Sequence, residues 1–584
     1  MQEGAKADPI VVEVVANYLT EISNEMSIAL QRTSYNMMIY EVKDYCCTLL
    51  GANGDLWSQN VGGVSHFVAD MGVIIRDGVK KYGVDGFSPG DVIIHNHQRV
   101  AGQHLNNIVT YAPIFFKQKL KAFSAVRAHW NDIGGMSTGW GSMLSHDAWE
   151  EGLQLNQVKL YDGGKLDGKV MDIIKDNLRT PEASSGDLRA QVASCRLAER
   201  LLIDLYGKYG EEVIENAIPV IFEQTDTKIR KAVMQFKEGT YESEGFLDET
   251  ALAGGTGRIR IAAKVTLKGD GDAIVDFTGT SPQSTVPINS RSNAAANIPF
   301  KALTDPFGSV NEGSFRRLKI VNPEGTIMMA RFPAPMGHWS LVLPMAVDVV
   351  LRALAPALPD RVPAAHSGEM GPATFFYGVN RDGKRFITQT GGGGGWGGRP
   401  FEDGPFPSGN ICQGDVKNAP IETIELKQPI LVEKRALRTD SGGPGMFRGG
   451  MGTVSSFRNL IDGYWTLGLS RRIKNPPWGI WGGKPGAPHK VTLLLPDKTI
   501  LSGSHVEKLL SAEGALATIE TTGGGGWGNP LERDPKKVSW DVLEGYVSIE
   551  SARRDYGVIL NSDMSPDLSA TKELRAKLMR EHST

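Results

Sequence analysis

Apolar side chains recur at three- and four-residue intervals near the start of the chain. This spacing places them on one face of a helix and predicts an amphipathic helix over residues 9–32 that packs against a core. From Cys46 to Phe123 the pattern changes to short apolar runs separated by Gly, Asn and Pro, including DVIIHN and IVTYAPIFF. Such runs are typical of β-strands joined by tight turns.

Two longer helical patterns follow between Ser185 and about Phe236, with Asp187 expected at the N-cap or in the first turn. Beyond Gly239 the runs become strand-like again, as in RIRIAAKVTLKG and VTLLLP. This order of patterns predicts an α+β (mixed α/β) fold with several domains. We divide the chain into an N-terminal α/β region (1–184), a helical segment (185–238), a strand-rich central region (239–390) and a Gly-rich, β-dominated C-terminal region (391–584).

Composition and charge narrow the class of protein. Of the 584 residues, 41% are hydrophobic and 22% are charged, as in soluble globular proteins. Lys and Arg number 63 against 66 Asp and Glu, so no basic excess favours nucleic acid or an anionic membrane as partner. We find neither a signal-peptide pattern nor an apolar run of the eighteen or so residues that a spanning helix needs. Four cysteines, two of them adjacent, suit a reducing compartment, and we expect a cytoplasmic protein.

Glycine is the residue type that departs most from the average. The chain has 69 Gly, about 12% against a usual 7% or so, which indicates backbone positions that need positive φ or close approach. Two glycine runs, starting at Gly391 and Gly523, each contain a tryptophan. Flexible hinges are one interpretation, but a tryptophan inside each run favours ordered loops anchored by a buried aromatic side chain.

The histidines gather in one part of the chain. Five of the eleven lie between residues 95 and 146: His95, His97, His104, His129 and His146. The motifs GQHLNN and RAHWNDIGG each close a predicted strand, so we expect His104 and His129 side by side at one end of a sheet, with Asp44 as a carboxylate that joins them. Imidazoles and carboxylates that converge in this way bind Zn²⁺, Mn²⁺ or Fe²⁺. For each histidine alone, a hydrogen-bonded core or surface imidazole is the simpler interpretation.

Two other chemistries stay open. Cys46 or Cys47 is a possible nucleophile, although adjacent strand residues point to opposite faces and at most one faces any site. The run DSGGPGMFRGGMG predicts either an anion cradle beside Arg448 or a simple chain of turns. No G-x-x-x-x-G-K-[ST] motif is present, so we expect any nucleotide to bind to a partner chain.

Six motifs, in order, resemble those of the N-methylhydantoinase B family over nearly the whole chain. They are DIGG, GDLRAQ, DFTGTSPQ, FPAPMG, NAPIETIE and DSGGPGMFRGGMG. That family includes the B-type half of 5-oxoprolinase, lactam hydrolases such as caprolactamase, and subunits of acetone and acetophenone carboxylases. The resemblance implies an A-type, hydantoinase A-like partner that uses ATP to phosphorylate a carbonyl or enolate oxygen, in a hetero-oligomer where the B-type chain completes the reaction.

The resemblance also implies a divalent metal (Zn or Mn, possibly Fe) at Asp44, His104, Asn107 and His129. Asn107 stands where the family pattern has an aspartate; its neutral amide is a weaker ligand, and Asp132 is a possible substitute. His97 or Asp132 would orient or deprotonate an attacking water. The first hypothesis is therefore an ATP-dependent hydrolase subunit for a cyclic amide: a hydantoin, 5-oxoproline or a lactam. A ketone carboxylase subunit, favoured by Asn107, and a non-catalytic scaffold for the A-type chain are the alternatives.

Overall fold

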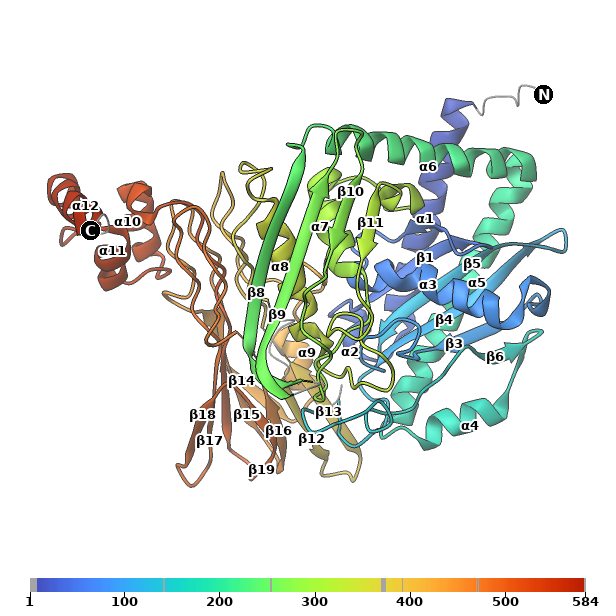
Figure 1. Cartoon of the computed structure of the whole chain (residues 1–584). Coiled ribbons are helices and arrows are strands. Elements are labelled where there is room, and N and C mark those ends of the chain that lie inside the picture. Colours follow the sequence, from blue (N-terminus) through green and yellow to red (C-terminus); the bar gives the residue numbers. More distant parts are fainter. Residues whose placement is uncertain are drawn as a thin grey trace.

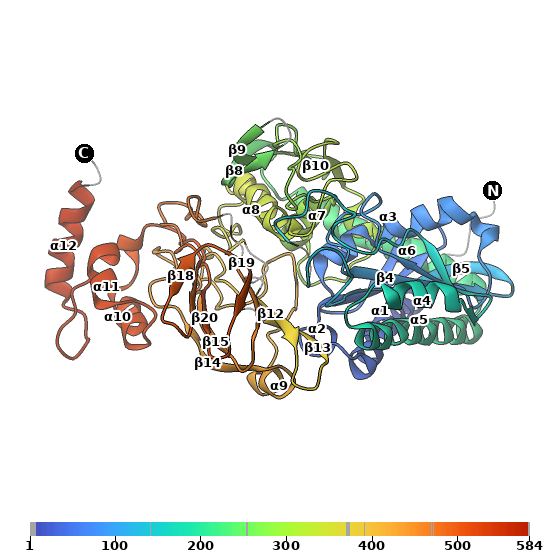
Figure 2. The same cartoon turned by 90° about the horizontal axis from the view of Figure 1, so that it is seen from below.

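The computed structural model describes residues 8–139, 142–252, 255–368, 374–390, 392–468, 470 and 472–581. The chain folds into several parts, each built from helices and largely antiparallel sheets. This confirms the prediction of an α+β (mixed α/β) fold with several domains. Figures 1 and 2 show the N-terminal part and the C-terminal sheets on opposite sides of a central region. No described helix is long and apolar enough to cross a membrane.

A seven-stranded antiparallel sheet organises the N-terminal part, in the order β2-β1-β5-β4-β3-β6-β7. Its strands are β1 (Tyr45–Gly51), β2 (Leu56–Gln59), β3 (Val92–His95), β4 (Asn107–Phe116), β5 (Lys119–His129), β6 (Val158–Asp162) and β7 (Lys165–Leu166). The predicted first helix is α1 (Pro9–Thr33), whose apolar face packs in one core cluster with the long helices α5 (Pro181–Tyr209) and α6 (Glu211–Val233). Helix α3 (Ser65–Tyr82) covers the other face of the sheet.

The predicted helical segment therefore shares its core with the N-terminal sheet. Helix α5 begins at Pro181, so the prediction that Asp187 lies at its N-cap or in its first turn is wrong. The Asp187 carboxylate instead accepts hydrogen bonds from the backbone N–H groups of Tyr35 (2.7 Å) and Asn36 (3.0 Å), just beyond α1. Short helices α2 (Met37–Tyr40) and α4 (Gly168–Asp176) complete this part.

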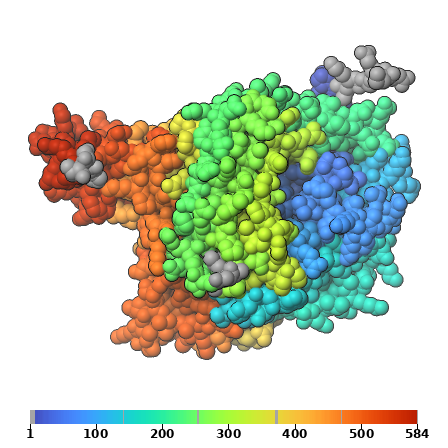
Figure 3. Space-filling view, in the orientation of Figure 1, coloured from blue at the N-terminus to red at the C-terminus, as the bar shows by residue number. Residues whose placement is uncertain are grey.

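The central region is a four-stranded sheet covered by helices. The strand order is β11-β10-β9-β8, with β8 (Gly239–Leu252), β9 (Gly255–Leu267), β10 (Ala273–Asp276) and β11 (Leu318–Val321). Helices α7 (Ala294–Thr304) and α8 (Leu343–Leu354) fill its core. The space-filling view shows this region as a broad ridge between the other two (Figure 3).

Two further sheets form the C-terminal part. One has the order β13-β12-β16-β19, with β12 (Thr374–Val379), β13 (Arg385–Thr390), β16 (Gly463–Leu467) and β19 (Val506–Ser511). The other has the order β14-β15-β20-β17-β18, with β14 (Ile430–Leu437), β15 (Thr453–Asn459), β17 (Lys490–Leu494), β18 (Ile500–Gly503) and β20 (Leu516–Glu520). Helix α9 (Ile421–Lys427) precedes β14. Helices α10 (Pro535–Leu543), α11 (Ile549–Tyr556) and α12 (Leu568–Glu581) project from the body (Figure 1).

The glycine runs are ordered, as predicted, but for a different reason. Gly391 lies outside the described residues. Residues 392–398 and 523–528 are extended, glycine-rich segments whose backbones pack against each other and against residues 442–452. Their N–H groups donate across this bundle, for example from Gly395 to the carbonyl of Thr522 (2.9 Å) and from Gly524 to that of Gly450 (3.0 Å). The two tryptophans are only half-buried, so close backbone approach orders the runs.

Candidate functional site

His104 and His129 meet at one end of the N-terminal sheet. Strands β4 and β5 pair in antiparallel register with Asn107 opposite His129, and His104 lies three residues before β4. The imidazole ring centroids are 4.8 Å apart, at an interplanar angle of 72°. GQHLNN therefore leads into a strand instead of closing one. Because the next strand runs antiparallel, the start of one and the end of the other still share a sheet end.

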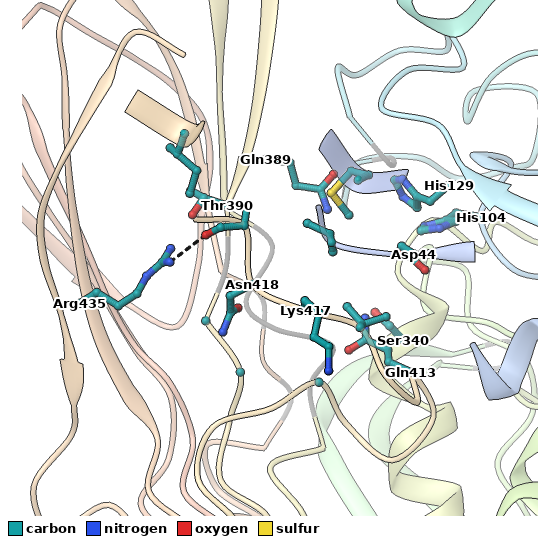
Figure 4. Close-up of a pocket in the computed structure, with 18 residues that line it drawn as sticks. Asp44, His104, His129, Ser340, Gln389, Thr390, Gln413, Lys417, Asn418 and Arg435 are labelled. Atoms are coloured by element: carbon teal, nitrogen blue, oxygen red, sulfur yellow. Dashed lines mark hydrogen bonds between the residues drawn. The ribbon is translucent and has the colours of Figure 1, made fainter. Parts of the chain in front are cut away.

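Asp44 reaches the same place from the residue before β1. Its carbonyl accepts a hydrogen bond from the backbone N–H of His129 (3.1 Å), so the main chain holds the two residues side by side. A pocket of about 90 Å³ is lined by Asp44, His104 and His129 on one side (Figure 4). The remaining walls come mainly from the C-terminal half and include Gln389, Thr390, Gln413, Lys417, Asn418 and Arg435.

Burial sets the charge state of this group. It lowers the pKa of His104 well below its ordinary value and that of His129 to about 3. It raises the pKa of Asp44 to about 7, against the opposing effect of the Arg127 guanidinium. Both imidazoles are therefore neutral at pH 7, and neutral imidazole is the form that binds a metal ion.

Neighbouring side chains fix which way the side-chain amide of Asn107 points. Its Nδ2 donates to Gln103 Oε1 (2.7 Å), while Gln103 Nε2 donates to the carbonyl of His66 (3.2 Å). Asn107 Oδ1 therefore faces His104 Nε2, 3.0 Å away. Since His104 is neutral and this oxygen only accepts, the ring proton lies on Nε2 and the lone pair on Nδ1. Asn107 orients His104 and does not line the pocket.

The donors fit a divalent transition metal in kind. Two neutral imidazoles and one carboxylate border the pocket, and no described residue donates a hydrogen bond to the buried Asp44 Oδ1. Among the residues that the structure describes, however, no three His, Cys, Asp or Glu side chains already form a group that could hold an ion.

His97 and Asp132 lie away from this pocket. The His97 ring packs on Phe332, with centroids 5.0 Å apart, and its Nδ1 accepts from the backbone N–H of Arg99 (3.2 Å). Asp132 is fully buried and engaged by the backbone and guanidinium of Arg179, the latter at 3.1 Å. Neither residue lines the pocket, so the structure does not bring either of the two expected water-orienting groups to the histidine pair.

The cysteines and Arg448 have structural surroundings. Cys46 and Cys47 are both fully buried and enter core clusters on opposite faces of β1. Burial raises the pKa of Cys46 to about 12 and that of Cys47 well above its ordinary value, so both thiols are protonated at neutral pH. Arg448 is paired with Asp541 at 3.4 Å, which links the glycine bundle to α10. This pairing favours the turn interpretation of DSGGPGMFRGGMG over an anion cradle.

The pocket residues of the C-terminal half were not predicted from the sequence. Gln389 and Thr390 end β13, and Arg435 lies within β14. Asn418, Ala419 and Ile424 of the lining belong to the motif NAPIETIE, but the sequence did not place that motif at the histidine pair. The segment from Gln413 to Lys417 joins these C-terminal walls to the N-terminal part, because the N–H of Lys417 donates to the carbonyl of Val42 (2.8 Å). No local pattern signals that pairing.

Comparison with known proteins identifies relatives along the full length. Residues 8–530 match the family described as hydantoinase B/oxoprolinase. The B subunit of a putative D-/L-hydantoinase from Pseudomonas sp. (strain NS671) is 31% identical, covering 98% of each chain. The beta subunit of the caprolactamase from Pseudomonas jessenii is 28% identical over 97% of this chain and 99% of that one.

Solved structures agree with this assignment. A crystal structure of ATP-dependent caprolactamase from Pseudomonas jessenii superposes with a TM-score of 0.90 at 27% identity, covering 97% of this chain and 99% of that one. A nucleotide-free acetone carboxylase structure has a TM-score of 0.91 at 19% identity, covering 98% of this chain and 83% of that one, and shows the shared fold alone. The chain belongs to the hydantoinase B/oxoprolinase family.

Proposed function

We propose that this chain is the B-type catalytic subunit of an ATP-dependent cyclic amide hydrolase, acting on a hydantoin, 5-oxoproline or a lactam. The observation that carries the proposal is the pair of neutral imidazoles, His104 and His129, that borders a pocket together with Asp44. The relatives named as the B subunit of a hydantoinase and the beta subunit of a caprolactamase support the substrate class and a two-subunit assembly.

The chemistry explains why two subunits would be needed. A relaxed cyclic amide is a poor electrophile because the nitrogen lone pair is delocalised into the carbonyl. Phosphorylation of the carbonyl oxygen by an A-type, ATP-binding partner gives an O-phosphorylated imidate, whose carbon is a better electrophile. After water adds to that carbon, the ring C–N bond breaks as the nitrogen takes up a proton, and the resulting acyl phosphate releases phosphate to a second water. The B-type chain then has to hold the activated ring, exclude competing solvent and present a nucleophile to the carbon.

A divalent metal, Zn or Mn or possibly Fe, would be held by Asp44, His104 and His129. When bound, such an ion lowers the pKa of a coordinated water and so supplies hydroxide near neutral pH. Asn107 Oδ1 keeps the His104 proton on Nε2, which makes Nδ1 the ring nitrogen that carries the lone pair. Gln389 and Gln413 also line the pocket and place side-chain amides there (Figure 4).

A ketone carboxylase subunit is the second candidate. Asn107 favours it, because an amide hydrogen-bonded to His104 supports a metal ligand less strongly than a carboxylate at that position would. The same pocket would then shield an enol phosphate and CO₂ from water. The acetone carboxylase structure shares the fold, which supports this candidate at the level of architecture alone. A non-catalytic scaffold for the partner remains the alternative outside the enzymes.

The test is co-purification of the full chain with an A-type partner, followed by a screen of lactams, hydantoins, 5-oxoproline and ketones with bicarbonate for ATP consumption. Substitution His129→Asn should abolish turnover and leave assembly intact, because the ring lies at a pocket. His146→Ala is the matched control, since that side chain is 75% exposed and distant from the pocket lining. Full activity of the His129 variant would support the scaffold and refute both enzyme proposals.

A further inference from the structure

Arg435 lies on the pocket wall opposite the two histidines. It belongs to β14, and Figure 4 shows its side chain on the far side of Asn418 from His104 and His129. One guanidinium nitrogen, Nη1, donates to the carbonyl of Ala419 (3.1 Å). Nε is buried and has no hydrogen-bond partner among the described residues.

This arginine also has no described carboxylate partner. None of the ion pairs of the described residues involves Arg435, whereas the neighbouring Lys417 is paired with Asp415. Burial lowers the pKa of Arg435, and no carboxylate offsets that effect. A guanidinium stays charged in proteins even so, and a half-buried charge that lacks a counter-ion is costly unless an anion completes it.

Two further polar side chains that line the pocket lack hydrogen-bond partners among the described residues. Thr390 Oγ1 and Gln389 Oε1 are buried without a hydrogen-bond partner among the described residues. A hydroxyl and a side-chain amide can both donate to an oxyanion, the amide after a flip that exchanges its nitrogen and oxygen. The wall with Arg435 therefore offers one fixed positive charge and the Thr390 hydroxyl to a ligand, while the Gln389 amide lies nearer His129 (Figure 4).

We propose that Arg435, with Thr390, binds the phosphoryl group of the activated substrate while its reacting carbon faces His104 and His129. The inference rests on the proposed function, which requires an O-phosphorylated substrate to enter this pocket. A phosphoryl group has several strong acceptor oxygens, and guanidinium donors match their geometry. Arg435 would thus hold both the incoming intermediate and the phosphate that leaves it.

The test uses the full chain, purified without phosphate, and inorganic phosphate as probe in isothermal titration calorimetry. Arg435→Met should weaken phosphate binding about 10- to 100-fold, as for loss of charge-assisted hydrogen bonds. Lys434→Met is the matched control, because it removes an exposed charge from the adjacent position of β14 and should leave binding unchanged. Phosphate should also raise the melting temperature of the wild type. Arg435→Met should melt cooperatively, which shows that it is folded, but its melting temperature should not change with phosphate.

Equal phosphate binding by Arg435→Met and wild type, or no binding by the wild type, would overturn the inference. The phosphoryl group can come from the activated substrate or from free phosphate, and assays of the complex with an A-type partner test each source. Arg435→Met should lower kcat/KM for the cyclic amide, and it should also abolish product inhibition by free phosphate. Arg435-dependent phosphate binding without turnover of any cyclic amide or ketone would refute the proposed function alone. Turnover with unchanged kcat/KM in Arg435→Met would refute this inference alone.

Discussion

The substitution Gly395→Ala tests why the chain is rich in glycine. A Cβ on Gly395 would lie 1.9 Å from the carbonyl oxygen of Gly450 and 2.6 Å from the backbone nitrogen of Gly524. A carbon–oxygen contact needs about 3.3 Å, so the two backbones would have to separate by roughly 1.4 Å. Neither obstacle is the end of a flexible side chain, and neither can move without disturbing the bundle.

The expected cost follows from the hydrogen bonds at that point. The N–H of Gly450 donates to the carbonyl of Trp396 (2.7 Å), and the N–H of Gly524 donates to that of Gly450 (3.0 Å). Loss of two such bonds costs about 1–3 kcal/mol, and overpacking adds about 1–3 kcal/mol. We expect a loss of about 2–6 kcal/mol in the free energy of unfolding. For a unit the size of the C-terminal region, this lowers the melting temperature by roughly 4–24 °C.

Differential scanning calorimetry of the full chain measures this effect, and limited proteolysis locates it. The control is Gly207→Ala in α5, where an added Cβ meets no atom within 4 Å. That change should be neutral or stabilise by about 0.5–1 kcal/mol, because alanine favours helix. If Gly395→Ala melted at the same temperature as Gly207→Ala, close backbone packing would not be the reason for the glycines.

Three further predictions follow from buried groups. Burial raises the pKa of Glu151 to about 7 from an ordinary 4.5, so the folded state holds an extra proton between these values. The contribution of this group to stability is therefore fully present below pH 4.5 and is lost as pH rises through 7. Glu151→Gln should remove about 3 kcal/mol of that slope in urea titrations at pH 4.5 and 8, and parallel wild-type and variant curves would contradict this. Asn107→Asp should raise metal retention about tenfold or more in chelator competition followed by elemental analysis, and unchanged retention would argue against a metal at His104. All four cysteines are fully buried, so they should react with a thiol reagent only after unfolding; rapid labelling of the native chain at Cys46 would reopen its role as a nucleophile.

Local patterns determined much of this protein. The three- and four-residue spacing predicted α1, and the short apolar runs predicted strands β1, β3, β4 and β5. These predictions succeed because helix and strand periodicity are properties of a few neighbouring residues. The crowding of histidines also pointed to His104 and His129, and antiparallel pairing of consecutive strands brought them together.

Only the tertiary structure decided the rest of the site. His97 and Asp132 come from the same stretch of sequence as the pair, yet packing on Phe332 and pairing with Arg179 direct them elsewhere. Arg435 lies more than three hundred residues from His129 and carries no motif, but it lines the same pocket. The sequence shows which reactive side chains the protein contains. Which side chains share a cavity depends on long-range packing. Here that packing includes glycines where a Cβ would collide with an opposing backbone, and only the tertiary structure shows which backbone lies opposite.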